Sequence, residues 1–383
     1  MRHNKNFSNR LFPFSRTESI LERRRTAIVI GGGILGLSTA CKLIHKYKVT
    51  LVNNTSLDKT NSASALYGTV YVPSPHENKE LYQLCKESYP CLAALTSIEG
   101  SGCTVIPIVQ YFASKAKQDK AIATNESVKA GCTSIVDLND KIYYQDKDFP
   151  YRIRVETIAI DFKIILKNFV NAFKKAGGIF KQEHINSLSS LKEKYDIVIV
   201  TAGWESAKLI NDPLSFPDRG VIIKVNTNML PNNLISKLPH YSFGVPPSMP
   251  GGDFRYFIRI GEICYLGTTL EPENGNNFTE EEKIKSAERV FKNLKGLIFE
   301  DALKALWLSE QKEISSGVRS RRKAMMPPML KRIEGTNIIA AYGCGGSTYA
   351  AFPAVSEQIG RIANSIANEK RICDKKKVIR SKL

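Results

Sequence analysis

The fold of this chain is decided by the stretch TAIVIGGGILG at residues 26–36. Its first five residues are an almost continuously apolar run, as in a strand buried on both faces of a parallel sheet. Apolar residues at helical spacing follow over 37–47, and a second strand is expected at 48–53. The order strand, glycine turn, helix and strand is typical of a βαβ unit that binds a dinucleotide.

Three glycines of this turn each allow a feature that a dinucleotide site needs. Gly31 permits the tight turn, Gly33 lets the backbone approach a pyrophosphate, and Gly36 lets the helix pack closely on the strand. The helix N-terminus offers N–H groups and a positive dipole end to the phosphates. The alternative is an ordinary glycine turn between a strand and a helix. The predicted cofactor contacts here are Gly31, Gly33, Ile34, Leu35 and Gly36.

Asn53 ends the second strand, where dinucleotide-binding units commonly place Asp or Glu for the ribose hydroxyls. An asparagine amide still forms hydrogen bonds with a hydroxyl, but it does not repel a 2′-phosphate as a carboxylate does. We expect Asn53 and the adjacent Asn54 to lie at the cofactor.

Length and composition suit a globular protein with two domains or one large discontinuous domain, at 383 residues and 43% hydrophobic content. No apolar run approaches the roughly 20 residues of a membrane-spanning helix, so we expect no membrane span. The 8 cysteines are scattered without a C-x-x-C pair, and there are only 5 histidines. We therefore predict no metal site and no disulfide framework.

The formal charge of +18 is concentrated at the two ends of the chain, and no nucleic-acid-binding motif accompanies it. We expect residues 1–25 to be a basic, disordered arm, although their Arg and Ser content also resembles a mitochondrial presequence. The basic tail at 369–383 ends in Ser381, Lys382 and Leu383, a tripeptide that matches the peroxisomal address. This predicts the peroxisomal matrix as location and its import receptor as partner, unless the match is a coincidence; nucleic acid is not expected.

Two further apolar strands run into glycine turns. The run YDIVIV at 195–200 leads into Thr201, Ala202 and Gly203, and the run NIIAA at 337–341 leads into a glycine-rich turn and another helix. Residues 76–154 and 216–309 instead contain strands of mixed polarity. We therefore predict an α/β protein with a discontinuous nucleotide domain at 26–75, 155–215 and 310–368, and a mostly antiparallel second domain.

Two helix starts are predicted from capping residues. Asp161 precedes apolar residues at helical spacing and is interpreted as an N-cap rather than a catalytic acid. Thr279 and Glu282 have the spacing of a capping box.

The motif at 29–40 resembles the N-terminus of the D-amino-acid oxidase family, within the FAD-dependent amine oxidoreductase superfamily. The similarity extends from about residue 26 to the end of the chain. Residues 196–204 resemble the second flavin-contacting strand and turn of the family, and residues 341–346 resemble its C-terminal glycine turn. Gly317-Val318-Arg319 falls where the family has Gly-x-Arg-Pro.

The resemblance implies a Rossmann-like FAD-binding domain, a substrate domain, and FAD bound without a covalent link. It implies oxidative deamination of a D-amino acid to a 2-oxo acid, ammonia and hydrogen peroxide, with hydride transfer to flavin N5 and O2 as oxidant. Arg319 would clamp the substrate carboxylate, and Tyr256 would assist it. The further cofactor contacts implied are Gly68, Ile185, Ala202, Gly203, Gly343, Gly345, Gly346 and Ser347.

Several departures from the family pattern bear on activity and substrate. Ser320 replaces the family's proline, which predicts a less fixed loop around Arg319, and Gly68 follows Tyr67 where the family is richer in small residues. Thr268-Thr269-Leu270 lacks the arginine of D-aspartate-selective relatives, which favours neutral D-amino acids unless Arg255 or Arg259 compensates.

Other functions remain open on the sequence alone. One is a related oxidase of sarcosine, glycine or D-aspartate, and another is a flavin-binding protein that has lost its chemistry. The oligomeric state is also open, with a homodimer as one option.

Overall fold

The computed structural model describes residues 25–57, 63–66, 68–72, 78–127, 133–135, 150–238, 242–245, 255–272, 278–295, 298–323 and 326–380. The expected disordered arm, apart from Arg25, lies outside these residues, as do Tyr67 and the C-terminal tripeptide. Within them, no helix has the length and apolarity needed to cross a lipid bilayer.

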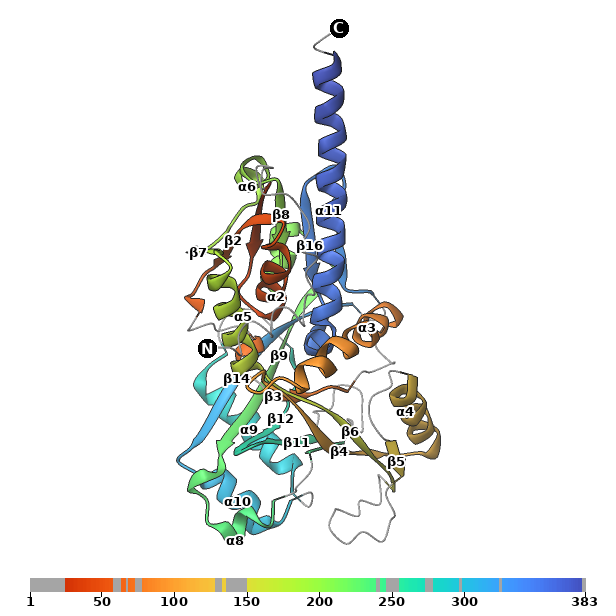
Figure 1. The fold of residues 1–383 in the computed structure, drawn as a ribbon. Helices are drawn as coiled ribbons and strands as arrows, with labels where there is room; N and C mark the ends of the chain where they lie inside the picture. The colour runs from red at the N-terminus through yellow and green to blue at the C-terminus, as the bar shows by residue number, and fades with distance from the viewer. Residues whose placement is uncertain are drawn as a thin grey trace.

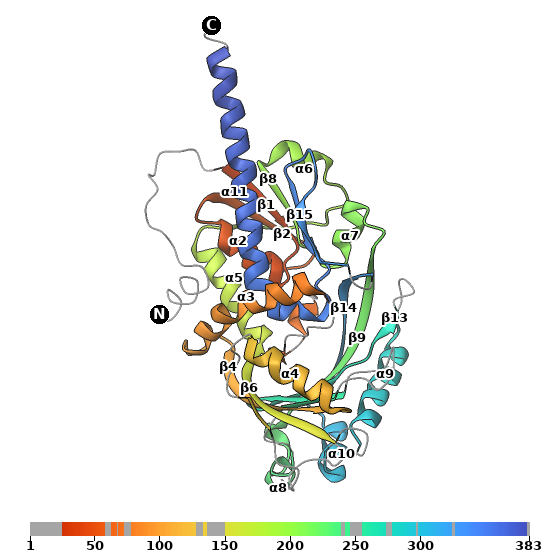
Figure 2. The ribbon, with the colours of Figure 1, turned by 90° about the vertical axis from the view of Figure 1, so that its right-hand side faces the viewer.

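Six strands form the first sheet, in the order β15-β16-β8-β1-β2-β7. Of these, β2, β7, β8 and β16 are labelled in Figure 1, and β1 and β15 in Figure 2. All neighbours are parallel except the edge strand β15, which is antiparallel to β16. The central strand β1 pairs with β2 on one side and with β8 on the other, as a dinucleotide-binding sheet requires. The strands are β1 (Arg25–Ile30), β2 (Tyr47–Asn53), β7 (Ile179–Gln182), β8 (Ile197–Val200), β15 (Met329–Arg332) and β16 (Ile338–Tyr342).

Helices cover both faces of this sheet because alternate strand residues point to opposite sides. Ala27 and Val29 belong to the large core that also contains residues of α2, α3, α5 and α11, whereas Ile28 and Ile30 pack towards α6 and α7. The last helix, α11, extends well beyond the body of the molecule (Figure 1). The helices are α2 (Ile34–Leu43), α3 (Lys79–Thr96), α5 (Phe162–Lys175), α6 (Ser189–Lys194), α7 (Glu205–Ile210) and α11 (Thr348–Arg380).

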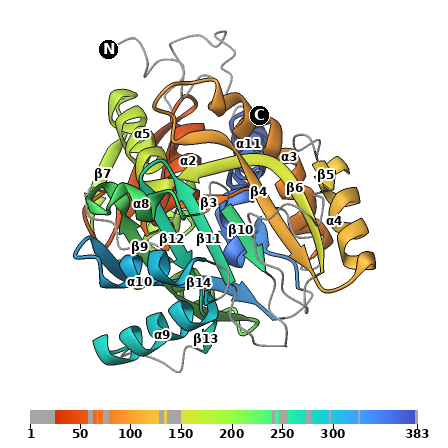
Figure 3. The same ribbon diagram turned by 90° about the horizontal axis from the view of Figure 1, so that it is seen from below.

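Ten strands form the second sheet, in the order β13-β9-β12-β11-β10-β4-β6-β3, with β14 also on β9 and β5 on β6. Its pairs are antiparallel except β10 with β4. Figure 3 shows the sheet from below, with α4 beside β6 and with α8, α9 and α10 around its other end. The strands are β3 (Gly68–Val70), β4 (Cys103–Phe112), β5 (Thr133–Ile135), β6 (Tyr151–Asp161), β9 (Ser215–Asn226), β10 (Ser242–Val245), β11 (Arg255–Ile260), β12 (Ile263–Gly267), β13 (Glu271–Pro272) and β14 (Lys312–Arg322). The helices are α4 (Lys115–Ser127), α8 (Asn232–Ile235), α9 (Glu280–Asn293) and α10 (Glu300–Leu308).

The long pair β9 and β14 runs from one sheet towards the other (Figure 2). It is paired from Lys312 opposite Val225 to Arg322 opposite Ser215. Strands β3 and β14 come from ranges in which the sequence predicts nucleotide domain, yet both belong to the second sheet. The junction between the two sheets therefore contains strands from the ranges predicted for the nucleotide domain and from those predicted for the second domain.

Both predicted helix caps are confirmed. The side chain of Asp161 accepts hydrogen bonds from the backbone N–H groups of Lys163 and Ile164, at the start of α5. Thr279 and Glu282 form a reciprocal capping box at the start of α9.

Candidate functional site

The glycine turn after β1 has no room for side chains. Gly31 has a φ of +112°, and a Cβ atom on it would lie 2.5 Å from the carbonyl oxygen of Thr201. A Cβ on Gly36 would lie 1.7 Å from the carbonyl oxygen of Gly31. Gly33 is the N-cap of α2, followed by the buried Ile34 and Leu35 at the helix start. The N–H groups of Gly31 and Gly32 bond within the chain, so the half-buried Gly33 at the N-terminus of α2 is the position where an anionic group could approach.

Asn53 supports this turn from β2. Its side-chain oxygen accepts a hydrogen bond of 3.0 Å from the N–H of Gly32, and its amide nitrogen donates to the carbonyl and hydroxyl oxygens of Thr55. Asn53 therefore holds the glycine turn in place, a role that the sequence pattern does not suggest. The neighbouring Asn54 is exposed at the same edge of the sheet.

The carboxyl ends of β2, β7 and β8 converge on the same edge. The hydroxyl of Thr201 donates to the carbonyl oxygen of Ile30, and Ala202 and Gly203 continue from there, with Gly203 at a φ of +62°. Ile185 follows β7 and packs in the small cluster that contains Val52. The structure thus gathers the predicted cofactor residues of three separate segments, at the edge where open α/β sheets bind ligands.

The C-terminal glycine turn lies between β16 and α11. Gly343 and Gly345 have φ values of +86° and +53°, Gly346 is exposed, and Ser347 is buried at the start of the helix. A Cβ on Gly345 would lie 3.2 Å from the Cγ atom of Arg321, on β14. The stem of an arginine from the second sheet therefore packs on this turn.

Gly68 accommodates a tyrosine. A Cβ on Gly68 would lie 2.4 Å from the ring of Tyr265 on β12, so this glycine makes room for the aromatic side chain. Burial raises the pKa of the Tyr265 phenol, which keeps it protonated. Sequence reasoning missed Tyr265, although the period-2 pattern of β12 places it on the same face as Gly267.

Strand pairing places Tyr256 and Arg319 on the same face of the second sheet. Tyr256 is opposite Gly267, which is opposite Ile222 on β9. Arg319 is opposite Asp218, four residues before Ile222 along β9. Directly opposed residues and residues two apart share one face, so the two predicted substrate residues project on the same side.

Arg319 is part of an ordered strand. The sequence predicts a less fixed loop at Ser320, but both residues lie in β14 and pair with β9, so that prediction is wrong. The Nη2 atom of Arg319 lies 3.2 Å from Oδ2 of Asp218 and donates to the carbonyl oxygen of Thr269 at 3.3 Å. Its Nε atom is fully buried and has no hydrogen-bond partner among the described residues.

A second charged cluster secures the start of β9. Arg322 on β14 and Tyr342 on β16 both bond to the carboxylate of Asp212, at 3.2 and 3.0 Å. Burial disfavours the charged form of Asp212, but hydrogen bonds from Ser215, Leu214, Tyr342 and Arg322 outweigh it and lower its pKa. This cluster joins the two sheets beside the C-terminal glycine turn.

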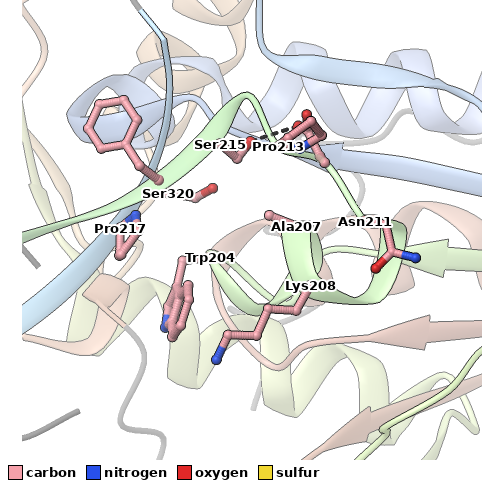
Figure 4. Close-up of a pocket in the computed structure, with 10 residues that line it drawn as sticks. Trp204, Ala207, Lys208, Asn211, Pro213, Ser215, Pro217 and Ser320 are labelled. Atoms are coloured by element: carbon pink, nitrogen blue, oxygen red, sulfur yellow. Dashed lines mark hydrogen bonds between the residues drawn. The ribbon is translucent and has the colours of Figure 1, made fainter. Parts of the chain in front are cut away.

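A pocket of about 300 Å³ lies on the other face of β9 and β14 (Figure 4). Its lining combines apolar residues such as Trp204 and Phe216 with polar ones, among them Ser320 from β14. Trp204 lies on its wall, with the Lys208 ammonium 3.8 Å from its ring centre. The pocket is separate from the face that carries Arg319, since Ser320 and Arg319 alternate along the strand.

The fold and the glycine turns define a flavin-dependent oxidoreductase. A family model described as "FAD dependent oxidoreductase" matches residues 26–361, and the chain belongs to this family. The chain is 24% identical over 360 residues to a D-amino acid oxidase of Dugesia ryukyuensis, covering 88% of this chain and 97% of the relative.

Solved structures share the fold at lower identity. A glycine oxidase from Geobacillus kaustophilus superposes with a TM-score of 0.67 at 12% identity, over 89% of this chain and 95% of that one. An L-alpha-glycerophosphate oxidase from Mycoplasma pneumoniae, solved with FAD bound, has a TM-score of 0.67 at 16% identity, over 89% and 94% of the chains.

FAD is the cofactor of this family, and the geometry of the glycine turn fits it. The absence of side chains on Gly31 and Gly36 lets the backbone of Thr201 and the start of α2 pack closely on the turn, and Gly33 lies at the helix N-terminus where a pyrophosphate would bind. Asn53 and Asn54 lie at the end of β2 where the ribose is expected, and Gly345 and Gly346 lie at the N-terminus of α11.

Proposed function

We propose that this protein oxidises neutral D-amino acids to 2-oxo acids and ammonia and reduces O2 to hydrogen peroxide. The observation that carries the proposal is the placement of Arg319 and Tyr256 on one face of the second sheet. A planar guanidinium is well suited to bind a substrate carboxylate through two parallel hydrogen bonds.

In the mechanism, bound FAD supplies the acceptor for the hydride of the substrate α-carbon. The chain's own residues orient the substrate. Arg319 on β14 binds the carboxylate, and the hydroxyl of Tyr256 on β11 donates a second hydrogen bond to it. The N-terminus of α11 offers N–H groups and a positive dipole end that favour negative charge near the Gly345 turn. No side chain is assigned as a base, because an amino acid bound as the free amine needs none.

The preference for a neutral side chain rests on the residues around Arg319. The hydroxyl of Thr268 donates to the carbonyl oxygen of Val221, and that of Thr269 accepts from the Val221 N–H, so both hydroxyls secure β9. Arg255 and Arg259 alternate with Tyr256 along β11 and thus lie on its opposite face. Neither arginine is placed to bind a second carboxylate beside Tyr256.

A substrate panel scored by peroxide release tests this function. We expect D-alanine and larger neutral D-amino acids to be oxidised with higher kcat/KM than N-methylglycine, glycine or D-aspartate, and L-alanine to be inert. The second candidate, an oxidase of glycine or a secondary amine, is supported by the fold shared with a glycine oxidase. Activity on N-methylglycine without activity on D-alanine would replace the first function by the second.

We also propose that the protein acts in the peroxisomal matrix. The support is the tripeptide Ser381-Lys382-Leu383, which matches a receptor-read address. A fluorescent protein fused to the N-terminus should enter peroxisomes with the tripeptide present and stay outside when Leu383 is deleted. Peroxisomal import of the deleted form would exclude this tripeptide as the signal.

A further inference from the structure

We infer that Asp218 sets the net charge of the substrate site and selects substrates with a single carboxylate. The inference rests on the proposed function, because it assigns Arg319 to the substrate carboxylate. No motif marks Asp218, whose role comes only from its position opposite Arg319 on the neighbouring strand.

Asp218 lies between two arginines on one face of the strand pair. Its Oδ2 atom lies 3.2 Å from Nη2 of Arg319 and 3.4 Å from Nη1 of Arg321. The exposed side-chain fractions are 8% for Asp218, 16% for Arg319 and 39% for Arg321. Asp218 is thus a buried carboxylate shared by one largely buried and one accessible guanidinium.

The three side chains carry two positive charges and one negative charge, which leaves one net positive charge. A substrate with one carboxylate neutralises this charge on binding. A second carboxylate that approached Arg321 would find its guanidinium already paired with Asp218. It would also be repelled by Asp218, and solvent screens such buried charges weakly.

Arg321 is held in a fixed position beside Asp218. Its stem packs on the Gly345 turn, and the backbones of Arg321 and Cys344 form an isolated bridge. The arginine is therefore fixed between Asp218 and the flavin-side turn. Removing the charge of Asp218 would free a positioned guanidinium for a second anionic group.

Asp218→Asn tests the inference because it removes the charge and keeps the shape. We expect the ratio of kcat/KM for D-aspartate to that for D-alanine to rise about tenfold or more, mainly through KM for D-aspartate. The double variant D218N/R321Q should return this ratio towards the wild-type value. Asp212→Asn is the matched control, since it removes a buried acid paired with the next arginine, and it should leave the ratio unchanged.

An unchanged ratio of the two kcat/KM values in D218N, with or without an equal loss for both substrates, would overturn the inference. Asp218 would then serve only to position Arg319. A binding measurement separates this outcome from failure of the proposed function. Perturbation of the bound flavin's absorbance by acetate and by malonate needs no turnover, and D218N should gain affinity for malonate relative to acetate by a similar factor. If D-alanine is not a substrate, a gain in malonate affinity relative to acetate still supports the role of Asp218. If no such gain is measured, Asp218 does not have this role.

A second variant covers the case in which D218N does not retain FAD. Arg321→Gln in the wild-type background lowers the net charge to zero, so it should weaken binding of acetate and malonate alike. Unchanged affinities in R321Q would show that Arg321 and Asp218 do not set the charge of the site.

Discussion

The hydroxyl oxygen of Tyr256 lies 2.6 Å from the point that a Cβ atom would occupy on Gly267, its partner on the neighbouring strand. The absence of a side chain on Gly267 therefore lets the tyrosine lie across β12. This relationship holds the phenol on the face that carries Arg319, which is why we assign both residues to the substrate.

Tyr256→Phe should raise KM for D-alanine about ten- to a hundredfold, the scale of one lost hydrogen bond to a charged group. The ring remains, so FAD content and Tm should stay near the wild-type values. Steady-state peroxide assays measure the effect. Tyr47→Phe, which removes a hydroxyl bonded to Asn364 at the opposite end of β2, is the control and should leave KM unchanged. Equal KM values for wild type and Tyr256→Phe would place the phenol outside the substrate site.

Gly36→Ala should abolish FAD binding, because its Cβ would lie 1.7 Å from the carbonyl oxygen of Gly31 and force the turn open. The ratio of flavin to protein absorbance after purification measures retention of the cofactor. Gly360→Ala is a matched control, since its Cβ would meet Lys42 at an ordinary 3.5 Å. Full FAD content in Gly36→Ala would show that the turn relaxes without cost to the cofactor.

Asp212→Asn should destabilise the protein in a pH-dependent way. The folded-state pKa of Asp212 is lowered, so its contribution is present above the unfolded value of about 4 and is lost as pH falls through the folded pKa. We expect a loss of about 1–3 kcal/mol at pH 7 that shrinks at acidic pH.

The Tm of wild type and of Asp212→Asn, each measured from pH 7 down to pH 3, gives this difference in stability as a function of pH. Asp301→Asn removes a carboxylate that pairs with Lys237 at the surface and should change Tm little at any pH. A difference between wild type and Asp212→Asn that stays constant over this range would contradict the assignment of the effect to the charged form.

Asp161→Ala should lower stability by about 1 kcal/mol without changing kcat, because the carboxylate caps α5. Asp161→Ser retains a capping oxygen and should recover most of the loss. Thermal unfolding and peroxide assays on the same preparations measure both quantities. A large fall in kcat at unchanged Tm would instead make Asp161 a participant in the reaction.

Local patterns predicted much of this molecule. The βαβ unit at 26–53, the second glycine junction at Gly203, the C-terminal turn and both helix caps depend on residues close in sequence, and their spacing is visible without a structure. The alternation of sheet and helix in the nucleotide-binding part follows from the same periodicities.

What the sequence did not predict depends on strand register. The partner of Arg319 is Asp218, about a hundred residues earlier, and Tyr265 meets Gly68 across two strands that are distant in sequence. No local pattern encodes such pairs. Asn53 is a further example. The sequence predicts a cofactor contact for it, but not its hydrogen bond with the N–H of Gly32 in the neighbouring turn.

The most direct test of the proposed D-amino acid oxidation is the absorption spectrum of the FAD-loaded protein mixed with D-alanine in the absence of oxygen. We predict rapid bleaching of the flavin band with D-alanine and none with L-alanine, and recovery of the band when oxygen is admitted. Arg319→Ala should keep the flavin band but need far more D-alanine to bleach it. A wild-type flavin that stays oxidised with D-alanine and other neutral D-amino acids would contradict the proposed function.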